Sequence, residues 1–108
     1  MSNTQTIELK AESVTYYSQN DETAFYDWLG KIRCVTATGG HGNISTITVQ
    51  LDLVDEESLR DLLALFHRYH IDKAQLTALD RPEFSSWFHD KRKYWWAGVF
   101  GSDRDDRE

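Results

Sequence analysis

The chain has 108 residues, of which 40% are hydrophobic and 13% aromatic. This composition can build a packed core, excludes an intrinsically disordered chain, and fits a single domain. The formal net charge of −6 disfavours nucleic-acid binding, because acidic surfaces repel phosphate, and it favours a basic protein partner.

Cysteine usage and hydropathy indicate the cellular compartment in which we expect the protein. Cys34 is the only cysteine, so no intramolecular disulfide can form. A protein without disulfides is compatible with a reducing compartment. The N-terminus lacks the pattern of a signal peptide, and no apolar run approaches the roughly 20 residues of a membrane helix. We therefore expect a cytoplasmic protein without a membrane segment.

Residues 6–12 alternate between apolar and polar side chains, which predicts a half-buried strand with Ile7, Leu9 and Ala11 on one face. The apolar phase then shifts to Val14 and Tyr16. A bulge or bend near Ser13 is expected there, because a slip of one residue exchanges the two faces of a strand.

A helix follows, capped by Ser18 or Asn20 and ending near Gly30. Its spacing predicts an apolar face formed by Phe25, Trp28, Leu29 and Ile32. The residues expected to face away from the core are Tyr26, Asp27 and Lys31.

Two strands come next, over residues 33–38 and 44–53, and residues 39–43 are expected to form the turn of their hairpin. The second strand alternates, which predicts one dry face and one threonine-rich face. The side chains expected on the dry face are Ile47, Val49, Leu51 and Leu53.

The clearest helical pattern covers residues 55–71, with Asp55 as its N-cap and Glu56 and Glu57 in its first turn. Apolar side chains recur at steps of three and four residues. The face they define consists of Leu59, Leu62, Leu63, Phe66, Tyr69 and His70.

The C-terminal third predicts short helices. One starts at a capping box at Asp72 and runs through Leu79, and another starts around residues 80–83, with the only proline near its first turn. Residues 90–100 either continue that helix or form a separate one that starts at Asp90. The charged segment 102–108 is expected to be disordered.

These elements predict an α+β fold in a single domain over residues 1–101. The order is strand, helix, strand, strand, helix and a helical C-terminus. The simplest assembly is a mostly antiparallel sheet of about three strands packed against helices on one face.

Three features have both a chemical and a structural interpretation. His67 and His70 have a spacing that can bind a metal, but no Cys/His pair supplies further ligands, and His70 lies on the predicted apolar face. Cys34 is either a nucleophile or, as we favour, a buried thiol. The glycines around His41 either bind phosphate or, as we favour, form the hairpin turn. We predict no catalytic residue, cofactor or metal.

Partner binding is the function that the surface residues favour. Acidic side chains around the start of the central helix could contact a basic partner, although helix capping explains some of them. Trp96 is the candidate aromatic anchor, since two adjacent tryptophans of a helix cannot both point into one core. Residues 91–93 beside three aromatic side chains suggest an alternative, nucleic-acid binding, which we do not favour. The predicted acidic contacts are Asp52, Asp55, Glu56 and Asp61.

Three segments carry a resemblance. They are YYSQNDETAFYDWL (16–29), LRDLLALFHRY (59–69) and YWWAGVFG (94–101), and they resemble a group of small, mostly uncharacterised bacterial proteins with the same order of motifs. In general character the chain is similar to immunity proteins of bacterial toxin systems, which are small, acidic and cytosolic. The resemblance implies tight binding to a toxin. The alternatives are a self-associating scaffold, such as a homodimer, and a small metal-dependent enzyme that uses His67 and His70.

Overall fold

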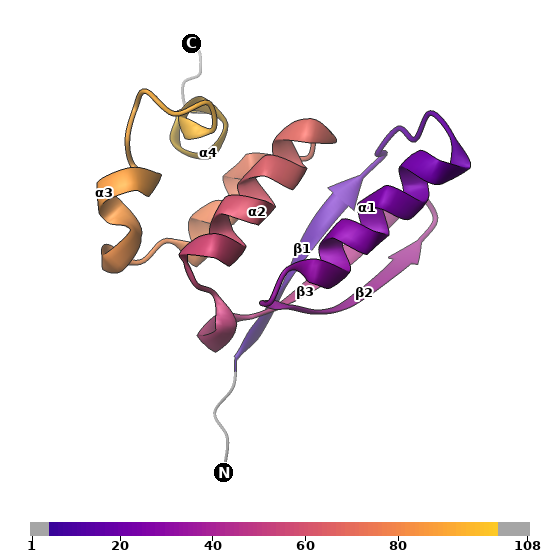
Figure 1. Ribbon diagram of the computed structural model, residues 1–108, viewed down its shortest axis with the longest axis horizontal. Helices are drawn as coiled ribbons and strands as arrows, with labels where there is room; N and C mark the ends of the chain where they lie inside the picture. The colour runs from indigo at the N-terminus through magenta and orange to yellow at the C-terminus, as the bar shows by residue number, and fades with distance from the viewer. Residues whose placement is uncertain (1–4, 102–108) are drawn as a thin grey trace. The chain divides into compact units, whose positions relative to one another are not determined.

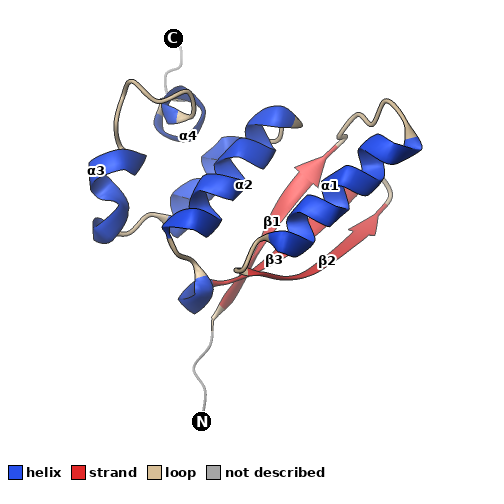
Figure 2. Cartoon of the chain, viewed as in Figure 1, coloured by secondary structure: helices blue, strands red, loops and turns tan. Residues whose placement is uncertain are grey.

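The computed structural model describes residues 5–101 and divides the chain into two compact units, of which the first ends at Ile71 and the second begins at Asp72. The fold is α+β, as predicted: a three-stranded antiparallel sheet with several helices (Figures 1 and 2). The predicted tail 102–108 lies outside the described residues.

The sheet belongs to the first unit and consists of β1 (Thr6–Glu12), β2 (Val35–His41) and β3 (Ile44–Gln50). The strand order is β1-β3-β2, and both pairs are antiparallel. Strand β3 is therefore central, while β1 and β2 form the two edges.

The predicted alternation of β1 is confirmed, because Leu9 and Ala11 are buried and their polar neighbours are exposed. The bend near Ser13 is also confirmed. Ser13 has a φ of +54° just after the strand ends, and Val14 and Tyr16 beyond it are half-buried.

The hairpin turn is shorter than predicted. It consists of Gly42 and Asn43 alone, so Gly39 and Gly40 lie within β2. Gly42 has a φ of +64°, and a positive φ at the first turn residue is what a two-residue turn of type II′ requires.

The end of β3 also differs from the prediction, since the strand stops at Gln50 rather than Leu53. Residues Leu51–Leu53 form the short 3-10 helix η1, which is closed by the N–H of Val54 donating to the carbonyl of Leu51 at 3.2 Å. This turn redirects the chain from the sheet into the next helix.

Helix α1 (Gln19–Lys31) is capped by Ser18, whose Oγ accepts the N–H of Asp21 at 3.1 Å. Phe25 and Leu29 are buried, as predicted. The prediction that Tyr26 faces away is wrong. Its side chain is half-buried, and its hydroxyl shares a 2.8 Å hydrogen bond with Ser45 of β3, because that flank of α1 lies against the sheet.

Helix α2 (Glu56–Arg68) begins as predicted, with the carboxylate of Asp55 accepting the N–H of Ser58 at 2.8 Å. The strongly apolar face is buried, and α1 and α2 run antiparallel to one another (Figure 1). The fully buried residues of this face are Leu59, Leu62, Leu63, Leu65 and Phe66.

The predicted place of His70 on the apolar face is wrong. The helix ends at Arg68, and His70 is exposed with a φ of +60°. The N–H of Ile71 donates to the carbonyl of Phe66 at 2.8 Å, and the N–H of His70 donates to that of His67 at 3.4 Å. This is the Schellman pattern of helix termination, with histidine in the left-handed position that glycine usually holds.

The second unit contains the 3-10 helices η2 (Lys73–Leu79) and η3 (Pro82–Phe84) and the short helices α3 (Ser85–Phe88) and α4 (Trp96–Phe100). Residues 90–100 do not continue α3, which stops at Phe88; they contain a separate helix, as in the second interpretation, but it starts at Trp96 rather than at Asp90. Buried Trp95 explains the break: its indole N–H donates to the carbonyl of Phe88 at 2.9 Å and closes the loop between the two helices.

Candidate functional site: a hollow beside Tyr17

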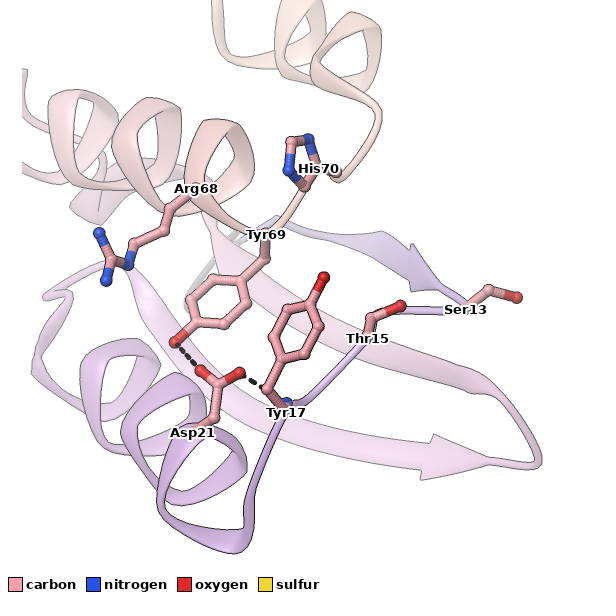
Figure 3. Close-up of a pocket in the computed structure, with 7 residues that line it drawn as sticks. All are labelled: Ser13, Thr15, Tyr17, Asp21, Arg68, Tyr69 and His70. Atoms are coloured by element: carbon pink, nitrogen blue, oxygen red, sulfur yellow. Dashed lines mark hydrogen bonds between the residues drawn. The ribbon is translucent and has the colours of Figure 1, made fainter.

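The first unit contains a surface hollow of about 330 Å³ (Figure 3). Three separate parts of the chain meet there, namely the bend that follows β1, the first turn of α1 and the C-terminal end of α2. The lining residues are Ser13, Thr15, Tyr17, Asp21, Arg68, Tyr69 and His70.

Asp21 joins these three parts. One carboxylate oxygen accepts the backbone N–H of Tyr17 at 2.9 Å, and the other accepts the hydroxyl of Tyr69 at 3.2 Å (Figure 3). The ring of Tyr69 also packs edge-on against that of Phe25, with centroids 4.9 Å apart. Partial burial and then the bond to Asp21 raise the pKa of Tyr69 above its usual value. The end of α2 is thereby fixed to the start of α1.

Tyr17 is the most exposed large hydrophobic side chain of the described residues, at 88%. Its backbone is nevertheless held by Asp21, in a segment whose next residue, Ser18, caps α1. An exposed aromatic ring on a fixed backbone loses little conformational entropy when a partner covers it.

Two residues with a strained backbone conformation line the same hollow. Within residues 5–101, Ser13 and His70 are the only non-glycine residues with positive φ, at +54° and +60°. Both line the hollow, although they lie far apart in sequence. Such conformations cost roughly 1–3 kcal/mol each, and they cluster at active sites and ligand-binding sites.

The chemistry of the hollow is polar and of mixed charge. Arg68 supplies a permanent positive charge, Asp21 a negative one, and His70 an imidazole whose ring nitrogens can form hydrogen bonds. The hydroxyls of Ser13 and Thr15 can donate or accept. This set suits recognition of a polar surface around an aromatic contact, which is the usual anatomy of a protein interface.

The sequence prediction missed this site. The bend near Ser13 was visible in the shifted alternation, but the left-handed conformation of His70 had no signal, since neither glycine nor asparagine stands there. Tyr17 and Asp21 were assigned only to the fold.

The predicted acidic contacts lie on η1, at the cap of α2 and along that helix. Asp52 is exposed and accepts a hydrogen bond from the side chain of Gln50 at 2.9 Å, and Glu56 is exposed and pairs with Arg60 at 2.8 Å. Asp61 is half-buried. Of the four predicted acidic contacts, Asp52 and Glu56 are therefore the two that are exposed.

Asp55 has a structural role as the N-cap of α2. The backbone N–H of Ser58 holds the pKa of Asp55 below its usual value, and Arg33 lies 3.9 Å away. Capping accounts for this residue without a partner.

Trp96, the predicted aromatic anchor, is half-buried in the second unit, whereas Trp95 beside it is buried. The ammonium of Lys91 lies 5.6 Å from the centre of the Trp96 ring, and Phe100 packs at 6.3 Å. The expected division of the two tryptophans is confirmed, but much of the Trp96 ring is engaged by its own unit.

Cys34 and the histidines can be placed directly. Cys34 is fully buried, and burial raises the pKa of its thiol to about 11, so little thiolate exists at neutral pH. His67 and His70 are both exposed, and no group of three or more His, Cys, Asp or Glu side chains within residues 5–101 could hold a metal ion. His41 is exposed and is the last residue of β2.

Comparison with protein-family models, with curated proteins and with solved structures found no match for this chain. No helix within the described part of the chain is both long enough and apolar enough to cross a membrane.

Proposed function

We propose that this protein is a non-enzymatic binding module and that it contacts a protein partner through the hollow and the aromatic ring beside it. We call this region the Tyr17 surface and define it as Ser13, Thr15, Tyr17, Arg68 and His70. One observation carries the proposal: the most exposed large aromatic residue and both strained non-glycine residues of residues 5–101 meet at one hollow.

The physical argument rests on how interfaces obtain affinity. Tyrosine and arginine are enriched among the residues that dominate binding energy, because they bury a large area and still form hydrogen bonds. Tyr17 and Arg68 flank the same hollow, and Asp21 holds the backbone of Tyr17 in place. A partner side chain that entered the hollow would meet hydroxyls and charges already oriented.

The most concrete form of the proposal is an immunity protein that neutralises a bacterial toxin by direct binding. The chain's net charge of −6 supports it, since many toxins of this kind carry basic clefts, and an acidic surface accelerates association with them. In this role the exposed carboxylates of Asp52 and Glu56 steer the encounter, while the Tyr17 surface sets the lifetime of the complex.

The test begins with recovery of the partner. The tagged chain is expressed in its own source organism, bound proteins are identified by mass spectrometry, and the complex is then rebuilt from purified components. Hydroxyl-radical footprinting of the rebuilt complex is expected to protect Tyr17 strongly and to leave Tyr94, an exposed tyrosine of the second unit, unchanged. Equal labelling of Tyr17 in the free and bound chain would remove the Tyr17 surface from the interface.

The toxin assignment has its own test. The recovered partner is expressed alone and together with the chain, and growth of the host is measured. Growth arrest by the partner alone, relieved by the chain, supports the immunity role. A harmless partner would leave a binding module of another kind.

A further inference from the structure

One edge of the sheet is open and uncharged. Within residues 5–101, no strand pairs with the outer side of β2, and its residues from Thr36 to His41 are all exposed. The other edge strand, β1, carries Glu8, Lys10 and Glu12. Charged side chains on an edge strand discourage pairing with another chain, whereas a neutral exposed edge invites it.

The hydrogen bonds of the sheet determine which backbone groups of β2 point outward. The N–H of Gln50 donates across to Cys34 just before β2 at 2.9 Å, whereas the next N–H, that of Leu51, donates to Gln5 just before β1 at 2.9 Å. The backbone N–H and C=O groups of successive residues of β3 therefore point alternately toward β2 and toward β1. Those of the even-numbered residues point toward β2, as the alternation of an antiparallel ladder requires.

The register then shows which residues of β2 direct their backbone groups toward β3 and which direct them outward. Ala37 and Gly39 lie opposite Thr48 and Thr46, so their backbone groups point toward β3. The N–H and C=O groups of Thr38 and Gly40 point away from β3, into solvent. A bulge between Val35 and Ala37 ends the regular stretch on the other side, which limits the open edge to residues 37–41.

We propose that two copies of this chain pair antiparallel along β2, with Gly39 facing Gly39 of the second copy on the two-fold axis. In this register Thr38 lies opposite Gly40 of the other copy, so each outward N–H finds a carbonyl. The two sheets then become one continuous sheet. The proposal does not depend on the Tyr17 surface.

Two features favour a second copy over an unrelated strand. A two-fold axis places identical residues opposite or diagonal to one another, so a charged strand would bring like charges together. No such repulsion arises here, because β2 carries no Asp, Glu, Lys or Arg. Gly39 also has no side chain at the axis, where facing residues of a non-hydrogen-bonded pair approach to about 4.5 Å between Cα atoms.

The first test is the mass of the purified chain by sedimentation equilibrium over a range of concentrations. A reversible rise toward twice the chain mass of 12.6 kDa is expected. Thr38→Pro removes one outward N–H per copy and leaves the β2–β3 ladder intact, so two hydrogen bonds per dimer are lost. Dimerisation is expected to weaken by at least about tenfold.

Glu8→Pro is the matched control, because its N–H points outward from the opposite edge strand by the same alternation. It is expected to keep the dimer. Circular dichroism checks that both variants fold. A wild-type chain that stays monomeric at millimolar concentration overturns the proposal, as does a dimer that Glu8→Pro weakens as much as Thr38→Pro.

Disulfide trapping tests the register and is independent of any proline effect. Gly39→Cys places two thiols face to face on the axis, within the range that a disulfide spans. Ala37→Cys lies on the same face of the same strand, but four positions of offset separate its thiols by roughly 13 Å. The new Cβ at position 39 lies 3.3 Å from Oγ1 of Thr46, so folding of this variant is confirmed first.

Covalent dimers are expected for Gly39→Cys at a rate at least tenfold above that of Ala37→Cys. The wild-type chain is the background, since its only thiol, Cys34, is fully buried. Equal trapping at both positions would refute this register. Trapping of a different protein at position 39 would show that the edge takes another partner's strand.

Discussion

Removal of the Asp21 carboxylate is the most informative perturbation of the candidate site. Asp21→Ala deletes two hydrogen bonds, to the N–H of Tyr17 and to the hydroxyl of Tyr69, and also a negative charge in the first turn of α1. Each bond is partly exposed and contributes about 1 kcal/mol, and the charge at the helix N-terminus adds about 0.3–1 kcal/mol. The better helix propensity of alanine offsets about 0.5 kcal/mol of this loss in the free energy of unfolding. We expect a loss of about 2 kcal/mol.

A double-mutant cycle isolates the bond between the two helices. Urea unfolding is measured for wild type, Asp21→Ala, Tyr69→Phe and the double variant. The coupling free energy between the two positions is expected to be about 1 kcal/mol, because each single variant removes the same hydrogen bond. Strictly additive losses would show that the 3.2 Å contact does not hold the end of α2, and that Asp21 does not organise the hollow.

The pKa of Tyr69 gives an independent check on this contact. Partial burial and then Asp21 raise it in the folded chain, so the folded state binds the phenolic proton more tightly than the unfolded state. The resulting stability is present below the usual tyrosine pKa of about 10 and is lost as pH rises through the folded value. In Asp21→Ala, NMR titration of the Tyr69 ring should give a lower pKa, and the alkaline loss should shrink. An unchanged pKa would contradict the assignment.

Three further predictions concern other residues. Asp55→Ala is expected to destabilise the chain by about 1 kcal/mol in urea unfolding. Because the pKa of Asp55 is lowered in the folded state, this difference should persist above pH ~4 and shrink as pH falls below it, and a difference independent of pH would contradict the capping role. His70→Gly should raise the melting temperature through a gain of about 1 kcal/mol, by relieving the left-handed backbone, while weakening partner binding. Trp95→Phe leaves the carbonyl of Phe88 without its donor and should cost about 1–3 kcal/mol in urea unfolding, whereas the neighbouring Trp96→Phe should cost less than about 1 kcal/mol, and equal losses would refute the difference in burial.

Much of the fold followed from local sequence patterns. The apolar spacing and the Asp55 cap predicted α2, and the alternation of residues 6–12 predicted β1, because each pattern reflects burial of one face of a single element. Gly39 and Gly40 misled the prediction, since glycine is common in turns, yet here both lie in an exposed edge strand.

The candidate site was beyond such patterns. Its central contact joins Asp21 to Tyr69, which are 48 residues apart, and it forms only when the start of α1 meets the end of α2. His70 continued the apolar spacing of α2 on paper, but the Schellman ending turns it outward. Periodicity marks the faces of a helix, and it does not show where the helix stops.

Binding through the Tyr17 surface is the central claim, and the affinity of the purified partner for two matched variants tests it most directly. Isothermal titration calorimetry should show that Tyr17→Ala weakens binding by at least about 30-fold, as loss of a dominant aromatic contact does, while Tyr94→Ala changes it by less than about threefold. A Tyr17→Ala variant that binds as tightly as the wild type, or a Tyr94→Ala variant that loses more, would place the interface elsewhere.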